Sequence, residues 1–276
     1  MTSTTDPQPP FDLDRIGGVR ALRALVDAVL DAGDRAAAMA GDLGPIERKD
    51  DESPVTIADR ETEARLRDHV DRHFPEIAFL GEETHGDAPL TAPGPGAGLR
   101  FVVDPIDGTR AFVRGLPSWS VLVGLEEGGR PVLGIAYLPA AEELYVAVAG
   151  DGATGNGRPL RVSDRTDLSR AAVGHGGLGQ FFDTDRGALL GRLARGTDTQ
   201  RGFADFANYA HLLAGRLDLV VDPGVAPWDV CAATVIVREA GGQATDLSGG
   251  DPVYGAGFLA TNGHLHQAAL DLLAGG

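Results

Sequence analysis

Apolar residues recur at helical spacing in two segments near the start of the chain. Over residues 14–40 they fall every three or four positions, with Asp and Arg between them, which predicts a long amphipathic helix. A second helix is expected over residues 56–74, because Pro75 stops it, and its inward face carries Leu66 and Val70. Each helix therefore presents one apolar face to a core.

Short apolar runs follow the second helix and predict strands over residues 77–80, 101–103, 121–125, 132–138 and 144–148. Further along, helices are expected over 206–214, 228–240 and 264–273, and strands over 217–221 and 258–260. Alternating helix and strand predicts an α/β arrangement for this second half. The Gly- and Pro-rich segment 90–98 is expected to be a loop, and the Gly-rich segment 150–157 a hairpin turn.

The chain has 276 residues, which suits one large catalytic unit or two fused lobes. We expect an N-terminal α+β lobe over residues 11–149 and a C-terminal α/β lobe over 150–276, acting as one catalytic unit. Residues 1–10 are polar and Pro-rich, without a basic start or an apolar run. They are expected to be a disordered leader and not a signal peptide.

The formal net charge of −16 argues against nucleic acid or an anionic membrane as the main partner, because neither is attracted to such a surface. Cys231 is the single cysteine, so no disulfide can form within the chain, and a cytoplasmic location is expected. No stretch approaches the roughly 20 consecutive apolar residues of a membrane span. A soluble, acidic protein is predicted.

Acidic residues follow the ends of predicted strands or begin a predicted helix: Glu82 and Glu83, then Asp104 and Asp107, then Asp229. Open α/β sheets place their sites at such positions. An Asp at a helix start is also a common capping residue, and that alternative stays open for Asp229.

The segment Asp104-Pro105-Ile106-Asp107-Gly108-Thr109, here called the 104–109 motif, combines two acids with a restricted backbone. Pro105 makes a rigid turn after the strand, and two acids so close repel each other unless a cation lies between them. Oxygen ligands suit Mg²⁺, while His264 and His266 are expected as surface or cap residues. A Gly-Thr step entering a helix exposes N–H groups to an anion, so the motif predicts a metal-dependent phosphomonoesterase.

These motifs resemble the inositol monophosphatase superfamily, whose members are metal-dependent sugar and cyclitol phosphatases. The resemblance spans residues 16–272 and rests on Gly81-Glu82-Glu83, the 104–109 motif, Trp228-Asp229 and Glu239-Ala240-Gly241-Gly242, in the family's order. Ser53-Pro54-Val55-Thr56, leading to Asp59, fits as well. The resemblance implies a layered αβαβα sandwich of two lobes, with the active site between them, and a homodimer.

The resemblance also implies roles for single residues. Glu82, Asp104 and the Ile106 carbonyl would hold one Mg²⁺, and Asp104, Asp107 and Asp229 a second. A third, looser ion would share Glu82 and water. Water activated by metal and oriented by Glu82 and Thr109 would attack phosphorus. The resemblance further implies that Asp59 supports the Thr109 hydroxyl and that the Gly108 and Thr109 amides hold the phosphate. Lys49, a few residues before Ser53, also fits the family's sequence pattern. By themselves, Asp59 equally fits a helix cap and Lys49 a solvated surface residue.

Two acids of the second half are the candidates for reading the substrate. The resemblance implies that Asp222 stands where the family has a substrate-reading acid. Asp205 lies in a Gly-x-x-Asp-Phe-x-x-Tyr pattern similar to that of bacterial histidinol-phosphate phosphatases. Carboxylates pair well with the ammonium and imidazolium groups of histidinol. Asp205 could instead cap the helix that begins at Phe206. His175 has no assigned role.

Histidinol phosphate is therefore the expected substrate, in histidine biosynthesis. The alternatives are myo-inositol 1-phosphate and an amino-sugar or nucleoside phosphate of specialised metabolism. A protein that keeps the fold only to bind partners is the alternative outside enzymes, and the intact acids make it the weaker one.

Overall fold

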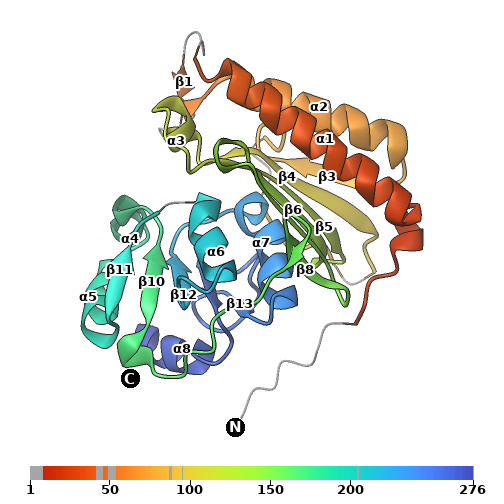
Figure 1. Ribbon diagram of the computed structural model, residues 1–276. Coiled ribbons are helices and arrows are strands. Elements are labelled where there is room, and N and C mark those ends of the chain that lie inside the picture. Colours follow the sequence, from red (N-terminus) through yellow and green to blue (C-terminus); the bar gives the residue numbers. More distant parts are fainter. Residues whose placement is uncertain are drawn as a thin grey trace.

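The computed structural model describes residues 9–41, 46–48, 54–86, 89–94, 96–203 and 205–275. Helices and two sheets stack in alternating layers (Figure 1). Helices α1 (Gly18–Met39) and α2 (Ile57–His73) cover the outer face of a seven-stranded sheet. Helices α6 (Asp205–Leu213) and α7 (Pro227–Glu239) fill the layer between this sheet and a five-stranded one. The predicted αβαβα sandwich is confirmed.

The seven-stranded sheet has the order β3-β4-β5-β6-β7-β8-β9, with β3 parallel to β4 and the other neighbours antiparallel. Its strands are β3 (Ala78–Gly81), β4 (Leu99–Asp107), β5 (Ser120–Glu127), β6 (Arg130–Leu138), β7 (Glu143–Val148), β8 (Gly152–Gly155) and β9 (Arg158–Pro159). The expectation of a simple hairpin turn over 150–157 is wrong, because β8 pairs with β7. The sheet thus continues past residue 149, and a lobe boundary at that point stays a proposal.

The five-stranded sheet has the order β11-β10-β12-β14-β13 and mixes parallel with antiparallel pairs. Its strands are β10 (Ala172–His175), β11 (Thr199–Arg201), β12 (Leu219–Asp222), β13 (Gln243–Thr245) and β14 (Phe258–Thr261). Helices α4 (Leu178–Asp183), α5 (Gly187–Gly196) and α8 (His266–Ala274) cover its outer face. The sequence patterns predicted β12 and β14 but not β10, β11 or β13.

Shorter elements complete the described chain. They are the pair β1 (Glu47–Arg48) and β2 (Pro54–Val55), helix α3 (Thr109–Val113), and the 3-10 turns Leu13–Ile16, Pro139–Ala141 and Leu168–Arg170.

Helix α7 lies directly on β5 and β6 because glycines face it. An added Cβ at Gly124 would lie 2.5 Å from Cys231 Sγ, and one at Gly134 would lie 2.4 Å from the Ala232 carbonyl oxygen. Contacts this close leave no room for a side chain at these two positions. The start of α7, which carries Asp229, is thereby held beside the seven-stranded sheet.

His266 is buried, in contrast to the surface or cap position expected for it. Its two ring nitrogens lie 3.0 Å from the hydroxyls of Thr245 and Thr261. Burial lowers the pKa of this imidazole to about 4. His266 therefore belongs to the interior of the second half.

Residues 1–8 of the expected leader lie outside the described residues. The described chain begins against the sheet: Arg130 Nη1 donates to the Pro9 carbonyl at 3.2 Å, and the buried Phe11 donates its N–H to Ala149 at 2.8 Å.

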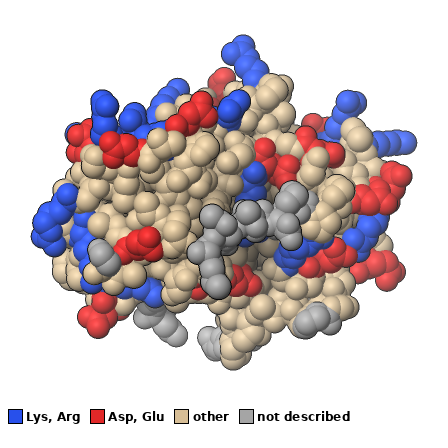
Figure 2. All heavy atoms as spheres, turned by 90° about the horizontal axis from the view of Figure 1, so that it is seen from below, with Lys and Arg blue, Asp and Glu red and all other residues tan. Residues whose placement is uncertain are grey.

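Among the described residues, no helix combines the length and the apolar character that crossing a membrane requires. On the face in Figure 2, acidic and basic side chains are interspersed around apolar and neutral surface, without one continuous basic patch.

Candidate active site

The 104–109 motif forms a bulge inside the sheet. Asp104 pairs with Leu122 of β5 and Asp107 with Ser120, so three residue steps on β4 oppose two on β5. The Ile106 N–H donates to Asp104 Oδ1 at 3.0 Å across this bulge. The sequence placed both acids on a turn after a strand ending at residue 103. That detail is wrong, because β4 continues through Asp107.

Asp104, Asp107 and Asp229 lie together: one carboxylate oxygen from each is within 4.8 Å of the others. Burial raises the pKa of all three well above the usual range, and neighbouring acids raise it further, Glu82 at Asp104 and Asp107 at Asp229. A divalent cation would remove this repulsion. An all-oxygen donor set of carboxylates suits a hard cation, so these residues fit the metal that the sequence predicted.

Asp229 is both a capping residue and a member of this cluster. It is the third residue of α7, and its Oδ2 accepts the N–H of Ala226 at 2.6 Å. The two readings of Asp229 that the sequence left open are therefore compatible. The cap fixes the carboxylate in place beside Asp104 and Asp107.

Asp107 joins the two halves of the chain. Its Oδ2 accepts the Ser120 hydroxyl at 2.7 Å and the Phe206 N–H at 2.9 Å. The first bond comes from β5 and the second from the start of α6. A buried carboxylate held by two donors has one orientation, so the cluster geometry depends on both halves.

Asp59 likewise has two roles. Its Oδ2 accepts the backbone N–H and the hydroxyl of Thr56, at 2.8 Å and 2.6 Å, and caps α2. Its Oδ1 lies 3.1 Å from the Thr109 hydroxyl, which is also 3.0 Å from the Ile106 carbonyl oxygen. The structure thus brings Asp59 to Thr109, as the resemblance implied. Lys49 lies outside the described residues.

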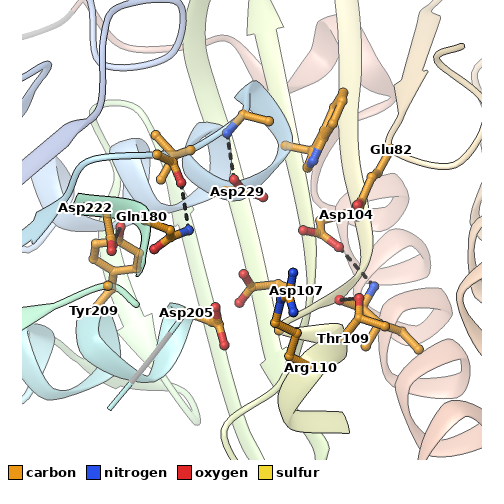
Figure 3. A pocket seen from close by; sticks show the side chains of 17 residues that line it. Glu82, Asp104, Asp107, Thr109, Arg110, Gln180, Asp205, Tyr209, Asp222 and Asp229 are labelled. Carbon is orange, nitrogen blue, oxygen red and sulfur yellow. Dashed lines mark hydrogen bonds between the residues drawn. The ribbon is translucent and has the colours of Figure 1, made fainter. Parts of the chain in front are cut away.

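A cavity of about 490 Å³ opens between the two halves (Figure 3). The seven-stranded sheet and α3 contribute one wall, with Glu82, Asp104, Asp107, Thr109 and Arg110. The second half contributes Gln180, Asp205, Tyr209, Asp222, Trp228 and Asp229. The predicted metal, phosphate and substrate residues that the structure describes therefore share one cavity; Asp59 stands behind it, in contact with Thr109.

Comparison with known proteins agrees with this arrangement. The model of the inositol monophosphatase family matches residues 20–274. The chain belongs to the inositol monophosphatase family. It is 37% identical over 239 residues to a histidinol-phosphatase of Mycobacterium tuberculosis, covering 84% of this chain and 88% of that protein. It is 32% identical over 264 residues to an inositol-1-monophosphatase of Rhizobium meliloti, covering 91% and 95%.

The solved structure of an inositol monophosphatase from Thermotoga maritima superposes with a TM-score of 0.81, at 29% identity, over 93% of this chain and 98% of that one. The named relatives are phosphoric monoester hydrolases, and this chain is a phosphatase of the same metal-dependent family.

In this inositol monophosphatase family member, Asp205 points into the cavity from the first position of α6 (Figure 3). Its φ of 48° lies in the left-handed region that Asp tolerates. Gly108 has a φ of 83°, which favours glycine, and an added Cβ there would lie 2.5 Å from Asp205 Oδ2. Burial, and then the charge of Asp222, raise the pKa of Asp205 to about 7.

Asp205 does not cap α6. Among the described residues, no hydrogen bond joins its carboxylate to a backbone N–H of that helix, and the Phe206 N–H donates to Asp107 instead. The capping alternative is therefore wrong, and the carboxylate faces the cavity with nothing of its own helix to bind.

Asp222 ends β12 and accepts the hydroxyl of Tyr209. Burial raises its pKa to about 6, while the Tyr209 bond and the nearby His175 lower it. An added Cβ at Gly176 would lie 2.1 Å from Asp222 Oδ1. The backbone just after β10 therefore lies against this acid. His175 itself is not among the residues that line the cavity; its Nδ1 lies 2.8 Å from the Gly176 carbonyl oxygen.

Tyr209 and Gln180 are among the cavity residues to which the sequence assigned no role. Tyr209 lies four positions after Asp205, one helical turn away, and that spacing was a usable signal. Gln180 gave no signal, because it is a polar residue on a six-residue helix. In the structure, Gln180 joins two loops at the cavity. Its Nε2 donates to the Gly224 carbonyl at 3.0 Å, and its Oε1 accepts the Gly177 N–H at 2.8 Å.

Proposed function

We propose that this chain is a Mg²⁺-dependent phosphatase that hydrolyses histidinol phosphate to histidinol. The observation that carries the proposal is the pair Asp205 and Asp222, a half-buried and a buried carboxylate on the cavity wall across from Thr109. Each repels the other, and a positively charged leaving group would offset that repulsion. The name of the Mycobacterium tuberculosis relative supports the same substrate.

Two to three Mg²⁺ ions would be held by five groups: the carboxylates of Glu82, Asp104, Asp107 and Asp229 and the Ile106 carbonyl. Bound Mg²⁺ supplies charge neutralisation for the phosphoryl group and a lower pKa for water. The remaining work falls to this chain's own groups, since positioning dominates phosphoryl transfer.

The Thr109 hydroxyl, held near Asp59, would orient the attacking water together with Glu82. The N–H groups of Gly108 and Thr109 would bind phosphate oxygens at the start of α3. Asp205 and Asp222 would bind the amine and imidazole of the leaving group, and thereby align the ester oxygen for departure.

The resemblance also supports a cytoplasmic homodimer as part of this proposal. Light scattering on the purified chain tests the dimer directly: a mass of twice 28.7 kDa is expected, and a single-chain mass would contradict it.

Histidinol phosphate and myo-inositol 1-phosphate, assayed at matched subsaturating concentrations with Mg²⁺, separate the two leading substrates. We expect a kcat/KM at least about tenfold higher for histidinol phosphate, the value of one charge-assisted hydrogen bond. Equal or reversed preference would overturn the substrate assignment. Asp104→Asn, prepared identically, controls for contaminating phosphatases.

myo-Inositol 1-phosphate is the second candidate for a specific reason. The Rhizobium meliloti relative has the name of an inositol-1-monophosphatase, and carboxylates such as Asp205 accept hydrogen bonds from hydroxyl groups. Amino-sugar and nucleoside phosphates complete the assay panel.

A further inference from the structure

A second buried acid on α2 contacts the turn that carries Glu82. Glu63 is 1% exposed and lies one helical turn after Asp59. Its Oε2 accepts the backbone N–H of Glu83 at 2.7 Å, and its Oε1 accepts the hydroxyl of Thr84. Both donors follow Glu82 directly, so the Glu63 carboxylate binds the turn immediately beyond the predicted metal ligand.

Gly81 makes this contact possible. An added Cβ at Gly81 would lie 2.4 Å from the carboxyl carbon of Glu63 and 2.5–2.6 Å from its oxygens. The carboxylate therefore lies against the backbone before Glu82 as well as after it. On the other side, the Glu82 N–H donates to the Val103 carbonyl of β4 at 3.2 Å. Glu82 is held between α2 and the strand of the 104–109 motif.

Arg67 extends the same line of residues by another helical turn. Its guanidinium donates to the Thr84 hydroxyl and lies 3.9 Å from Glu63 Oε1. It also stacks over the ring of Phe79 in β3, 4.2 Å from the ring centre. Arg67, itself stacked on Phe79, therefore holds the Thr84 hydroxyl and lies beside the Glu63 carboxylate.

Asp59 and Glu63 lie on one face of α2, because residues four apart share a helix face. Asp59 contacts Thr109 of the 104–109 motif, and Glu63 binds the turn after Glu82. One rigid helix turn therefore sets where Thr109 and Glu82 stand relative to each other. In the proposed function, Thr109 and Glu82 together orient the attacking water.

We propose that Glu63 is a positioning residue that holds Glu82 in register with Thr109. The inference rests on the proposed function for the role of Glu82. Partners that orient a metal ligand typically change metal affinity or activity by about 10–100-fold when they are replaced. No hydrogen bond among the described residues joins Glu63 to Asp205 or Asp222, the acids proposed to bind substrate. Replacing Glu63 should therefore leave KM nearly unchanged.

Glu63→Gln tests this, because it keeps the shape and turns one of the two acceptor oxygens into a donor. Glu63→Asp keeps the charge and shortens the reach. Glu61→Gln is the matched control, since Glu61 is an exposed glutamate on the same helix. Three readouts apply to each variant: Mg²⁺ affinity by calorimetry without substrate, hydrogen exchange of the peptide 79–86, and kcat against KM.

We expect Glu63→Gln to weaken Mg²⁺ binding about tenfold or more, to speed exchange in peptide 79–86, and to lower kcat with KM within about twofold. Glu63→Asp should show the same signature, and Glu61→Gln none of it. A variant that only destabilises the fold would lower the melting temperature while the folded fraction kept its metal affinity, and that result would overturn the inference. So would unchanged exchange in peptide 79–86.

Thr84→Val removes the hydroxyl that links Glu63 and Arg67 but keeps the Glu63 carboxylate and its bond to the Glu83 N–H, and it gives the same comparison if Glu63→Gln does not fold. Failure of the inference is distinguishable from failure of the function. A wild-type protein that binds Mg²⁺ but hydrolyses no ester of the panel contradicts the function, while the calorimetric and exchange results still decide the role of Glu63.

Discussion

Asp107 accepts a hydrogen bond of 2.9 Å from the backbone N–H of Phe206, a residue 99 positions further along the chain. The bond joins the bulge of β4 to the start of α6, next to Asp205. This contact therefore links the cluster proposed to bind metal to Asp205, one of the two acids proposed to bind substrate. Disturbing either end should affect both.

Ser120 provides the second donor to Asp107, at 2.7 Å, and is fully buried. We expect Ser120→Ala to raise the Mg²⁺ concentration for half-maximal rate by about tenfold, because the carboxylate loses one of its two orienting bonds. The free energy of unfolding should fall by about 1 kcal/mol. Ser169→Ala, at an exposed position, is the control for both measurements. An unchanged metal requirement would contradict the expectation.

Asp104→Asn should stabilise the metal-free protein while abolishing turnover. The substitution removes one of the mutually repelling carboxylates, yet an Asn oxygen can still accept the Ile106 N–H. We expect the melting temperature in EDTA to rise by about 2–4 °C, which corresponds to about 1 kcal/mol for a chain of this size.

Thermal melts with and without Mg²⁺ check this, because added Mg²⁺ should stabilise the wild type more than the variant. Asp164→Asn, at an exposed position, is the control. A lower melting temperature for Asp104→Asn in EDTA, or equal Mg²⁺ shifts, would argue against a cation site.

Asp205→Asn should reduce discrimination between cationic and neutral esters. Asn tolerates the φ of 48° at this position, so the change removes charge and little else. We expect kcat/KM for histidinol phosphate to fall about tenfold or more relative to that for myo-inositol 1-phosphate. Asp185→Asn is a matched control, because Asp185 has a φ of 55° and is exposed. An unchanged substrate ranking would refute the role of Asp205.

His266 should make the protein less stable in mild acid. Burial lowers its pKa from 6.5 to about 4, so the unfolded chain binds a proton more readily than the folded one below about pH 6.5. Its contribution is fully present above that pH and is lost as the pH falls toward 4. Between pH 7 and pH 5 the loss is about 2 kcal/mol.

Urea unfolding at pH 7 and pH 5 measures this difference. His266→Gln keeps partners for Thr245 and Thr261 but does not titrate, so its stability should fall less than that of the wild type over the same interval. Equal losses in the two proteins would assign the acid sensitivity to other groups.

The two N-terminal helices were predictable from their apolar period, whereas α4 and α5 were not predicted. The expectation over 56–74 closely matches α2, because a 3.6-residue repeat and a Thr cap are local properties of the sequence. Strand β10 was not predicted, although Val173 is buried at its centre. Its four residues, with a Gly and a His, show no period, and its place is decided by pairing with β11 and β12.

The site divides in the same way. The 104–109 motif predicted metal and phosphate binding because its acids, its Pro and its Gly-Thr step are adjacent in the chain. Gln180 and Glu63 carried no local signal. Gln180 acts through backbone groups of two separate loops, and Glu63 through a turn about 20 residues away. Such roles depend on which backbone donors and acceptors the fold leaves facing each side chain.

By itself, the sequence determined the chemistry: the acids, the phosphate turn and the periodic helices follow from residues that are neighbours in the chain. The tertiary structure alone decided which acids share the cavity, that Asp205 faces it without capping α6, and that Asp107 bonds to Phe206. The physical reason is that sheet pairing and burial bring residues together across about a hundred positions. No local pattern encodes the distance between them.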